Sequence, residues 1–425
     1  MQMRLAALAA CVVALAVALP THAAAPLSLD DAFARVADTH PQLRLFDARN
    51  DVLRAELERA TLGPALVAGA ELENAFGTGE ASGLGGAEVT LTLASVLERG
   101  GKLDARRILA NSRIDALAVE REAQRLDLLA EVARRYLDIV AAQQQARIAA
   151  LDVAQRQGTV AAARERHVAG ASPESVVFTA QAALARAELD KARAEERADA
   201  ARQHLAALWG ERAPGFSVVE QVATALPAIA GVDVLEDWLE RTPELAQFVG
   251  ERRIREARLQ LARSEATPDV DWQVGVRRLQ ESGDFGLVGS ISMPLGTRSR
   301  AQPGIRAAEA ELAALSVERE AKGLALYSTL AEAHGRYRVA RIEVQRLGED
   351  VLPRLAKAEA AAAQAYRAGA ASYLEWATLQ AEHTDARRQQ LDAALAAHRA
   401  LVEIQRLTGQ PFVATASATD EGDTP

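Results

Sequence analysis

The chain has 425 residues, of which 49% are hydrophobic, 25% are charged and only 4% are aromatic. A composition rich in Ala, Leu, Arg and Glu favours long, closely packed helices over a β-sandwich or an α/β enzyme. The formal net charge is −9. Because nucleic-acid binders normally carry a basic face, we expect no nucleic-acid partner. Cys11 is the only cysteine, which excludes a disulfide framework and a cysteine metal site.

Residues 1–23 have the pattern of a secretory signal peptide. Arg4 precedes an apolar run from Leu5 to Leu19, and the segment Thr21 to Ala23 resembles a small-residue cleavage site. The apolar run is shorter than the roughly 18 residues that a membrane-spanning helix needs. The sequence therefore predicts an exported protein that is periplasmic, secreted or located in an outer membrane.

The chain contains an internal duplication. The segment Ala116–Ala123 recurs at Ala314–Ala321, and His40–Leu43 recurs as Thr242–Leu245, in each case about 200 residues later. Because this unit is far longer than a solenoid repeat, we interpret it as a two-fold pseudo-repeat. The predicted organisation is a signal peptide at 1–23, a first repeat at 24–210, a linker at 211–232, a second repeat at 233–410 and an acidic tail at 411–425.

Each repeat ends in a long helical hairpin, predicted at 101–209 and at 301–408. The 3-4-3-4 spacing of a coiled-coil seam occurs in the first of them, at Leu126, Leu129, Ala133, Tyr136 and Val140. Gly170 is expected to end the outgoing helix, with Ser172 as the N-cap of the returning helix and Pro173 at its first position. In the second repeat, Pro353 is expected to interrupt or kink the outgoing helix.

A helix and a β-hairpin precede each helical hairpin, and the β-hairpins are predicted at 66–94 and 270–295. Apolar and polar residues alternate there in short runs, as in tilted transmembrane strands with an apolar outside and a polar inside. A soluble antiparallel sheet lying on a helix is the alternative. Four strands cannot close a barrel, and an open edge cannot lie in lipid. Transmembrane strands would therefore require several subunits, and three copies would supply twelve strands.

Motifs for catalysis and for metal or cofactor binding are absent from the sequence. It contains no HExxH, paired-cysteine, Walker or G-x-S-x-G motif. The histidines after the predicted signal peptide are scattered without the spacing of metal ligands. We therefore expect no enzymatic activity, no catalytic residue, no resident metal and no cofactor.

Three further motifs occur in a fixed order along the chain. His40–Leu43 reads x-P-x-L, Glu98–Lys102 reads E-x-G-G-K, and Tyr366–Glu375 reads Y-x-x-G-x-x-S-x-L-E. With the duplication and the order of elements, these motifs resemble the TolC-type outer-membrane efflux proteins over roughly residues 29–410. The E-x-G-G-K motif is similar to that of the CzcC-like heavy-metal branch of this family.

The resemblance implies a homotrimer in the outer membrane of a Gram-negative bacterium. Its fold would be mostly α, with a twelve-stranded β-barrel in the lipid and a periplasmic α-helical coiled-coil tunnel. A periplasmic adaptor would dock at the turns that contain Gly170, Ser172, Gly369 and Ser372, and Glu375 would form a pore constriction. The adaptor would connect the channel to an inner-membrane pump, most often of the RND type. Because both turns read Ala-Gly-Ala instead of the Val-Gly-Leu of many drug-efflux members, the identity of the adaptor stays open.

The function implied by the resemblance is passive conduction through the outer-membrane channel of a tripartite efflux system. The E-x-G-G-K motif favours divalent heavy-metal cations as the exported substrate, with drugs or secreted proteins as alternatives. Two other functions stay open, a periplasmic coiled-coil adaptor or scaffold and the outer-membrane duct of a type I protein secretion system. An adaptor usually has one helical hairpin between compact β-domains, whereas this chain has two hairpins and little remaining sequence.

Overall fold

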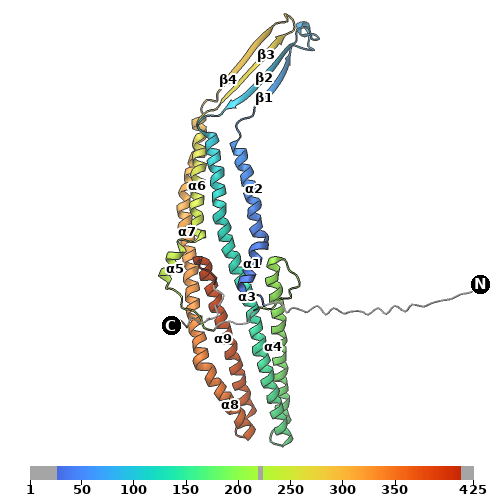
Figure 1. The fold of residues 1–425 in the computed structure, drawn as a ribbon, viewed down its shortest axis with the longest axis vertical. Coiled ribbons are helices and arrows are strands. Elements are labelled where there is room, and N and C mark those ends of the chain that lie inside the picture. Colours follow the sequence, from blue (N-terminus) through green and yellow to red (C-terminus); the bar gives the residue numbers. More distant parts are fainter. Residues whose placement is uncertain (1–25, 219–223, 413–425) are drawn as a thin grey trace, which may run out of the picture.

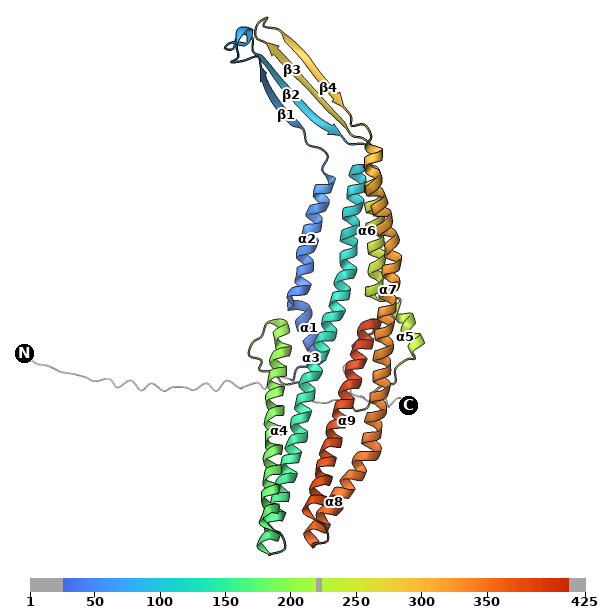
Figure 2. The same cartoon turned by 180° about the vertical axis from the view of Figure 1, so that it is seen from behind.

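The computed structural model describes residues 26–218 and 224–412. These residues form a long rod of helices with a β-sheet at one end, and the sheet is inclined to the helices (Figures 1 and 2). The predicted signal peptide at 1–23 lies outside the described residues, as does the predicted acidic tail beyond residue 412.

The two repeats contain the same order of helices and strands. The first consists of α1 (Leu29–Thr39), α2 (Pro41–Thr61), β1 (Val67–Glu73), the short 3-10 helix η1 (Gly79–Ala81), β2 (Glu88–Leu97), α3 (Lys102–Val168), α4 (Glu174–Ala206) and the 3-10 turn η2 (Ala207–Trp209). The second consists of α5 (Val232–Leu239), α6 (Pro243–Ser264), β3 (Val270–Leu279), β4 (Phe285–Ser292), α7 (Thr297–Arg346), the π-helical turn η3 (Leu347–Val351), α8 (Leu352–Ala368) and α9 (Tyr373–Thr408).

Local sequence signals explain several helix ends. Ser28 and Asp31 form a capping box, in which each side chain accepts a hydrogen bond from the other residue's backbone N–H, each at 3.1 Å. Pro41 begins α2, where its missing N–H would be unpaired in any case. Gly409 ends α9 with φ 69°, a left-handed conformation that glycine adopts without strain.

The four strands form one antiparallel sheet in the order β1-β2-β3-β4, so that strands from the two repeats pair at its centre. β2 extends beyond the predicted end of the hairpin at 94, because it stays paired with β3 as far as Leu97 and Val270. β4 ends at Ser292, before the predicted limit at 295. Pro294, which has no N–H to donate, follows two residues later.

The helical hairpin of the second repeat starts earlier than predicted, and its outgoing helix is interrupted near Pro353, as the sequence predicts. α7 begins at Thr297 instead of 301, because Gly296 takes φ 74° and turns the chain directly into the helix, which continues through Pro303. Near Pro353 the rod contains the π-helical turn η3 immediately before α8. Side-chain Nε2 of Gln390 donates to the carbonyl of Val344 at 3.4 Å, just before this turn.

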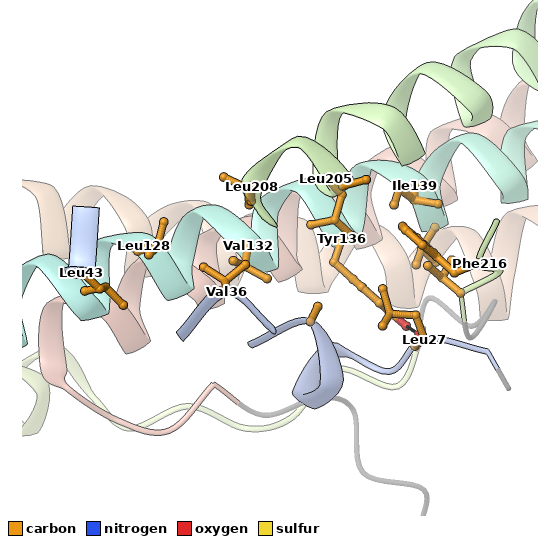
Figure 3. Packing of buried hydrophobic residues seen from close by; sticks show 14 residues of the cluster. Leu27, Val36, Leu43, Leu128, Val132, Tyr136, Ile139, Leu205, Leu208 and Phe216 are labelled. Carbon is orange, nitrogen blue, oxygen red and sulfur yellow. Dashed lines mark hydrogen bonds between the residues drawn. The ribbon is translucent and has the colours of Figure 1, made fainter. Parts of the chain in front are cut away.

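Each repeat has a hydrophobic core where its first short helix meets the long hairpin. In the first repeat, Leu27, Val36, Tyr136, Leu205 and Phe216 are among the buried residues that pack together (Figure 3). The hydroxyl of Tyr136 donates to the carbonyl of Leu27 at 3.0 Å. The second repeat has a matching contact, since Tyr337 donates to the carbonyl of Pro227 at 2.5 Å. In both repeats a buried tyrosine therefore attaches the entering chain to the long helix.

Candidate functional site

One face of the sheet is mainly apolar across all four strands, with Ser95 and Arg278 as its polar members. The register places Ala70 opposite Leu91, Leu91 opposite Val276, and Val276 opposite Leu287. Since directly opposed residues share a face, the apolar sets of the four strands lie on the same side. The side chains are exposed, Leu287 at 90% and Ile291 at 79%. A face of this kind is suited to contact with hydrocarbon and unsuited to contact with water.

The opposite face of the sheet is polar and charged. It carries Glu71, Glu73, Glu88, Thr90, Thr92, Asp271, Gln273, Arg277, Ser290 and Ser292. At the end far from the helices, the Arg277 guanidinium lies 2.9 Å from a carboxylate oxygen of Glu73 and 2.9 Å from one of Glu88. Its Nε also donates to the hydroxyl of Thr90 at 3.0 Å. The sheet therefore has the two unlike faces that the alternating sequence predicts.

The sheet and the helical layer each have two free edges in the described part of the chain. β1 and β4 each pair on one side only. In the half of the rod near the sheet, α2 packs on α3, α3 on α6 and α6 on α7, so α2 and α7 are the outer helices. Both outer helices expose apolar residues spaced seven apart, at Leu45 and Val52 on α2 and at Val317 and Leu324 on α7. Such spacing is typical of a seam against another helix.

The predicted contact turns lie together at the far end of the helices. Gly170 and Gly369 both adopt left-handed φ values, 69° and 83°, and both are exposed. Ser372 is the N-cap of α9 and accepts a hydrogen bond from the N–H of Glu375 at 3.2 Å. Ser172 does not cap α4 as predicted, because Pro173 occupies the N-cap position. The carbonyl of Ser172 instead lies 3.1 Å from Nδ1 of His167.

A single arginine connects these two turns. Nη1 of Arg166, near the end of α3, donates to the carbonyl of Tyr366 at 2.5 Å, and Nη2 lies 3.4 Å from the carbonyl of Ala171. Tyr366, Tyr373 and Trp376 form an aromatic cluster beneath the second turn. Sequence reasoning did not identify Arg166, since nothing in its own segment distinguishes it from other helix-surface arginines.

Glu375, the predicted constriction residue, is exposed in the first turn of α9. A carboxylate at this position is favoured by the partial positive charge of the helix N-terminus. It lies close in the chain to the exposed Leu374 and to the aromatic cluster, so the second turn combines an acidic group with apolar surface.

A layer of buried polar residues lies between α3, α8 and α9, not far from the turns. Its members are Asp152, Arg156, Thr159, Glu359, Gln380, His383 and Thr384. The carboxylate of Asp152 accepts from Nε of Arg156 at 3.1 Å and from the hydroxyl of Thr384 at 3.3 Å. Thr159 and Gln380 are hydrogen-bonded to each other, and Nδ1 of His383 lies 2.6 Å from Glu359. Because these contacts join α3 to α9, the layer fixes how the two hairpins pack together.

The described residues contain no group of three or more His, Cys, Asp or Glu side chains arranged to hold a metal ion. Within the same residues, no helix combines the length and the apolar character that a bilayer crossing requires.

Comparison with known proteins gives consistent matches over most of the chain. The family model described as "Outer membrane efflux protein" matches residues 32–211 and 234–410, one match in each repeat. The cobalt-zinc-cadmium resistance protein CzcC of Cupriavidus metallidurans is 29% identical over 316 residues, which cover 74% of this chain and 75% of that protein.

Solved structures of channel proteins share the fold. The outer membrane protein VceC of Vibrio cholerae superposes with a TM-score of 0.74 at 18% identity, covering 91% of this chain and 97% of VceC. CusC also gives a TM-score of 0.74 at 18% identity, covering 89% of this chain and 91% of CusC. The CusC structures concern conformational changes that accompany folding and transmembrane channel formation. At such identities the likeness concerns the fold alone.

Proposed function

Because the chain belongs to the outer membrane efflux protein family, we propose that it is the outer-membrane channel of a tripartite efflux system. Family and fold are those of channel proteins and not of enzymes. The observation that carries the proposal is the sheet with one apolar and one polar face. The apolar row that crosses the four strands, Ala70, Leu91, Val276 and Leu287, ends in a side chain that is 90% exposed. A soluble periplasmic scaffold would leave this face in water at a large free-energy cost.

The free edges of the sheet support a homotrimer. Each protomer supplies four strands with unpaired edges at β1 and β4, and an unpaired edge cannot lie in lipid. In the trimer, β4 of one copy would pair with β1 of the next. The same contact would place α7 of the first copy beside α2 of the second, so that the interface continues from the sheet along the helices. Three copies would then close a twelve-stranded barrel with the polar face inside, above a tunnel of helices in the periplasm.

The far end of the helices would meet the periplasmic adaptor of the system. The turns with Gly170, Ser172, Gly369 and Ser372 are exposed or half-buried, and they present apolar side chains such as Val168, which is 87% exposed. Glu375 would face the pore near this end and narrow it with a ring of carboxylates. Through the adaptor, the channel would receive substrate from an inner-membrane pump of the RND type, which supplies the energy.

Divalent heavy-metal cations are the proposed substrate. The support is the relative named for cobalt, zinc and cadmium resistance, at 29% identity. On the polar face of the sheet, Glu71, Glu73, Glu88 and Asp271 outnumber Arg277, so the lumen of a trimeric barrel would favour cations. A water-filled channel with this lining conducts cations passively.

The experiment that tests the channel is the molar mass of the protein extracted in detergent from purified outer membranes. We expect a trimer, together with single-channel currents in planar bilayers that prefer cations over anions. A soluble monomer in the periplasmic fraction would contradict the proposal and favour a scaffold. Growth of a deletion strain on cobalt, zinc and cadmium salts, compared with a panel of drugs, tests the substrate separately.

A further inference from the structure

The segment Glu98–Lys102 lies between β2 and α3, where the sheet meets the helices. It is the E-x-G-G-K motif whose resemblance favoured heavy-metal cations as substrate. We propose that this motif is a clamp that fixes the inclination of the sheet to the helices, and that it does not recognise the exported ion. The proposal rests on the trimeric channel proposed above and assigns the motif a positioning role within it.

The charged residues of the motif are used in contacts within the chain. Both carboxylate oxygens of Glu98 accept from the guanidinium of Arg106, each at 2.7 Å. Nζ of Lys102 lies 2.7 Å from one carboxylate oxygen of Asp269, and the N–H of Arg99 donates to the other at 3.0 Å. Asp269 directly precedes β3, so these bonds connect the end of β2 to the beginning of β3.

The four charges form a neutral and partly buried cluster. The side chains of Lys102 and Asp269 are 13% and 27% exposed, and those of Arg106 and Glu98 are 32% and 20% exposed. All four carboxylate oxygens accept a hydrogen bond within the chain, so a divalent cation would have to compete with Lys102, Arg106 and the N–H of Arg99 for them. Removing one partner of a pair in this partly desolvated position costs more stability than removing one partner of an exposed pair, because the remaining charge is left without compensation.

The two glycines of the motif are required for different reasons. Gly100 has φ 76°, and a Cβ at this position would lie 2.6 Å from the side chain of Thr267 and 3.0 Å from the carbonyl of Ser264. The backbone of the motif therefore packs directly against the chain between α6 and β3. Gly101 has φ 73° and is the N-cap of α3, where a Cβ would meet no neighbour. Together they turn the strand sharply into the helix.

Among the residues that the structure describes, the corresponding junction of the second repeat has no such clamp. Gly296 turns the chain into α7, and the hydroxyl of Thr297 donates to the carbonyl of Ala266 at 3.3 Å. In the described part of the chain, no ion pair joins the segment 293–300 to α6 or to the sheet. The clamp thus acts on the two central strands, β2 and β3, which are the pair that joins the two repeats.

A fixed inclination matters because strands in transmembrane barrels are tilted by roughly 35–45°. Three separate sheets close into one barrel only if each leaves its helices at the same angle. The sheet of this chain is inclined to the helices at the junction (Figures 1 and 2). The clamp supplies that angle in each protomer before the copies meet, which lowers the entropic cost of assembly.

The test compares variants in outer membranes of a strain that lacks the native gene. They are Lys102→Met, Asp269→Asn and the exchange of Lys102→Asp with Asp269→Lys. The control is Arg336→Met, which removes an exposed ion pair to Glu332 whose side chains are 70% and 60% exposed. Two readouts are taken for each, the temperature at which the trimer dissociates and the protection against cobalt, zinc and cadmium salts.

Each single variant should lower the dissociation temperature by roughly 1–4 °C, whereas the control should lower it by less than about 1 °C. The exchange should regain part of the loss, since the ion pair returns while the bond from Arg99 does not. Protection against the three metals should fall in a common proportion. An unchanged temperature, or a loss of protection against one metal alone, would overturn the clamp. A monomeric wild type would contradict the proposed function. In that case the clamp is tested on the monomer, and it is overturned if the Lys102→Met variant unfolds at the same temperature as the wild type.

Discussion

Arg166 and Tyr366 join the two helical hairpins at their turns. Nη1 of Arg166 lies 2.5 Å from the carbonyl of Tyr366, and the guanidinium lies 4.7 Å from the centroid of the tyrosine ring. The same side chain reaches the carbonyl of Ala171 in its own turn. One arginine from the first repeat therefore holds the turn of the second repeat in place, by a charged hydrogen bond and a cation–π contact.

Arg166→Lys should loosen the second turn while retaining the positive charge. Lysine lacks the planar fork that contacts two carbonyls and stacks on the ring. We expect amide hydrogen exchange at residues 366–372 to rise about fivefold, since the lost bonds contribute on the order of 1 kcal/mol to local stability. Hydrogen-exchange mass spectrometry measures this change. Arg164→Lys, at an exposed position of the same helix, is the control, and equal exchange in the two variants would contradict the role of Arg166.

Leu287→Lys should prevent the sheet from entering the membrane. Leu287 lies in the apolar row and is 90% exposed in the protomer, and a lysine on the lipid face of a barrel costs roughly 2–4 kcal/mol near the midplane. Ser290→Lys places the same residue on the polar face of the same strand and should be tolerated. The yield of heat-modifiable trimer in outer membranes distinguishes the two variants. Similar yields for both would show that the apolar face does not contact lipid.

The faces of the sheet could be predicted from the sequence because strand alternation is a local property. Successive side chains of a strand point to opposite faces of the sheet. The apolar Leu91 and the polar Thr90 therefore identify the two faces, and the face of every other residue in the strand follows from its position. The pairing of β2 with β3 was not predictable in this way. It joins residues such as Leu97 and Val270 that are far apart in the chain. No local sequence pattern specifies which strand of the first β-hairpin pairs with which strand of the second.

The buried polar layer could not be predicted for a related reason. Asp152, Gln380 and Thr384 belong to helices in which polar residues are common on every side, so each has the character of a surface residue in the sequence. Their burial depends on the approach of α9 to α3, which brings together residues from different repeats. Arg166 is another such case, because its partner Tyr366 belongs to the other hairpin.

Thr159→Val should destabilise the protein more than the double variant T159V/Q380L. The hydroxyl of Thr159 and the amide of Gln380 are hydrogen-bonded to each other at 3.0–3.1 Å, and both residues are at least 98% buried. Removing the hydroxyl alone leaves a buried amide unpaired, at a cost of about 1–3 kcal/mol, whereas replacing both removes the unpaired group. Urea unfolding of the two single variants and the double variant completes the cycle. Additive losses would mean that the two side chains are not coupled.

Glu98 and Asp269 should make the stability of the junction depend on pH. Hydrogen bonds from Arg106 hold the pKa of Glu98 below its usual value of 4.5. Burial raises the pKa of Asp269, but hydrogen bonds from Lys102 and the N–H of Arg99 outweigh it, so this pKa also lies below its usual value of 3.8. Both pKa values are thus lower in the folded chain than in the unfolded chain.

A carboxyl group whose pKa is lower in the folded chain stabilises that chain fully at pH values above its pKa in the unfolded chain. This stabilisation is lost as the pH falls through the pKa of the folded chain. The dissociation temperature of the wild type should therefore exceed that of the E98Q/D269N variant by a constant margin above about pH 5.5. The margin should shrink below about pH 4.5, as the carboxylates of the wild type take up protons. Thermal dissociation measured from pH 7 to pH 3 checks this, and a margin that stays constant down to pH 3 would show that the two carboxylates do not stabilise the junction through their charge.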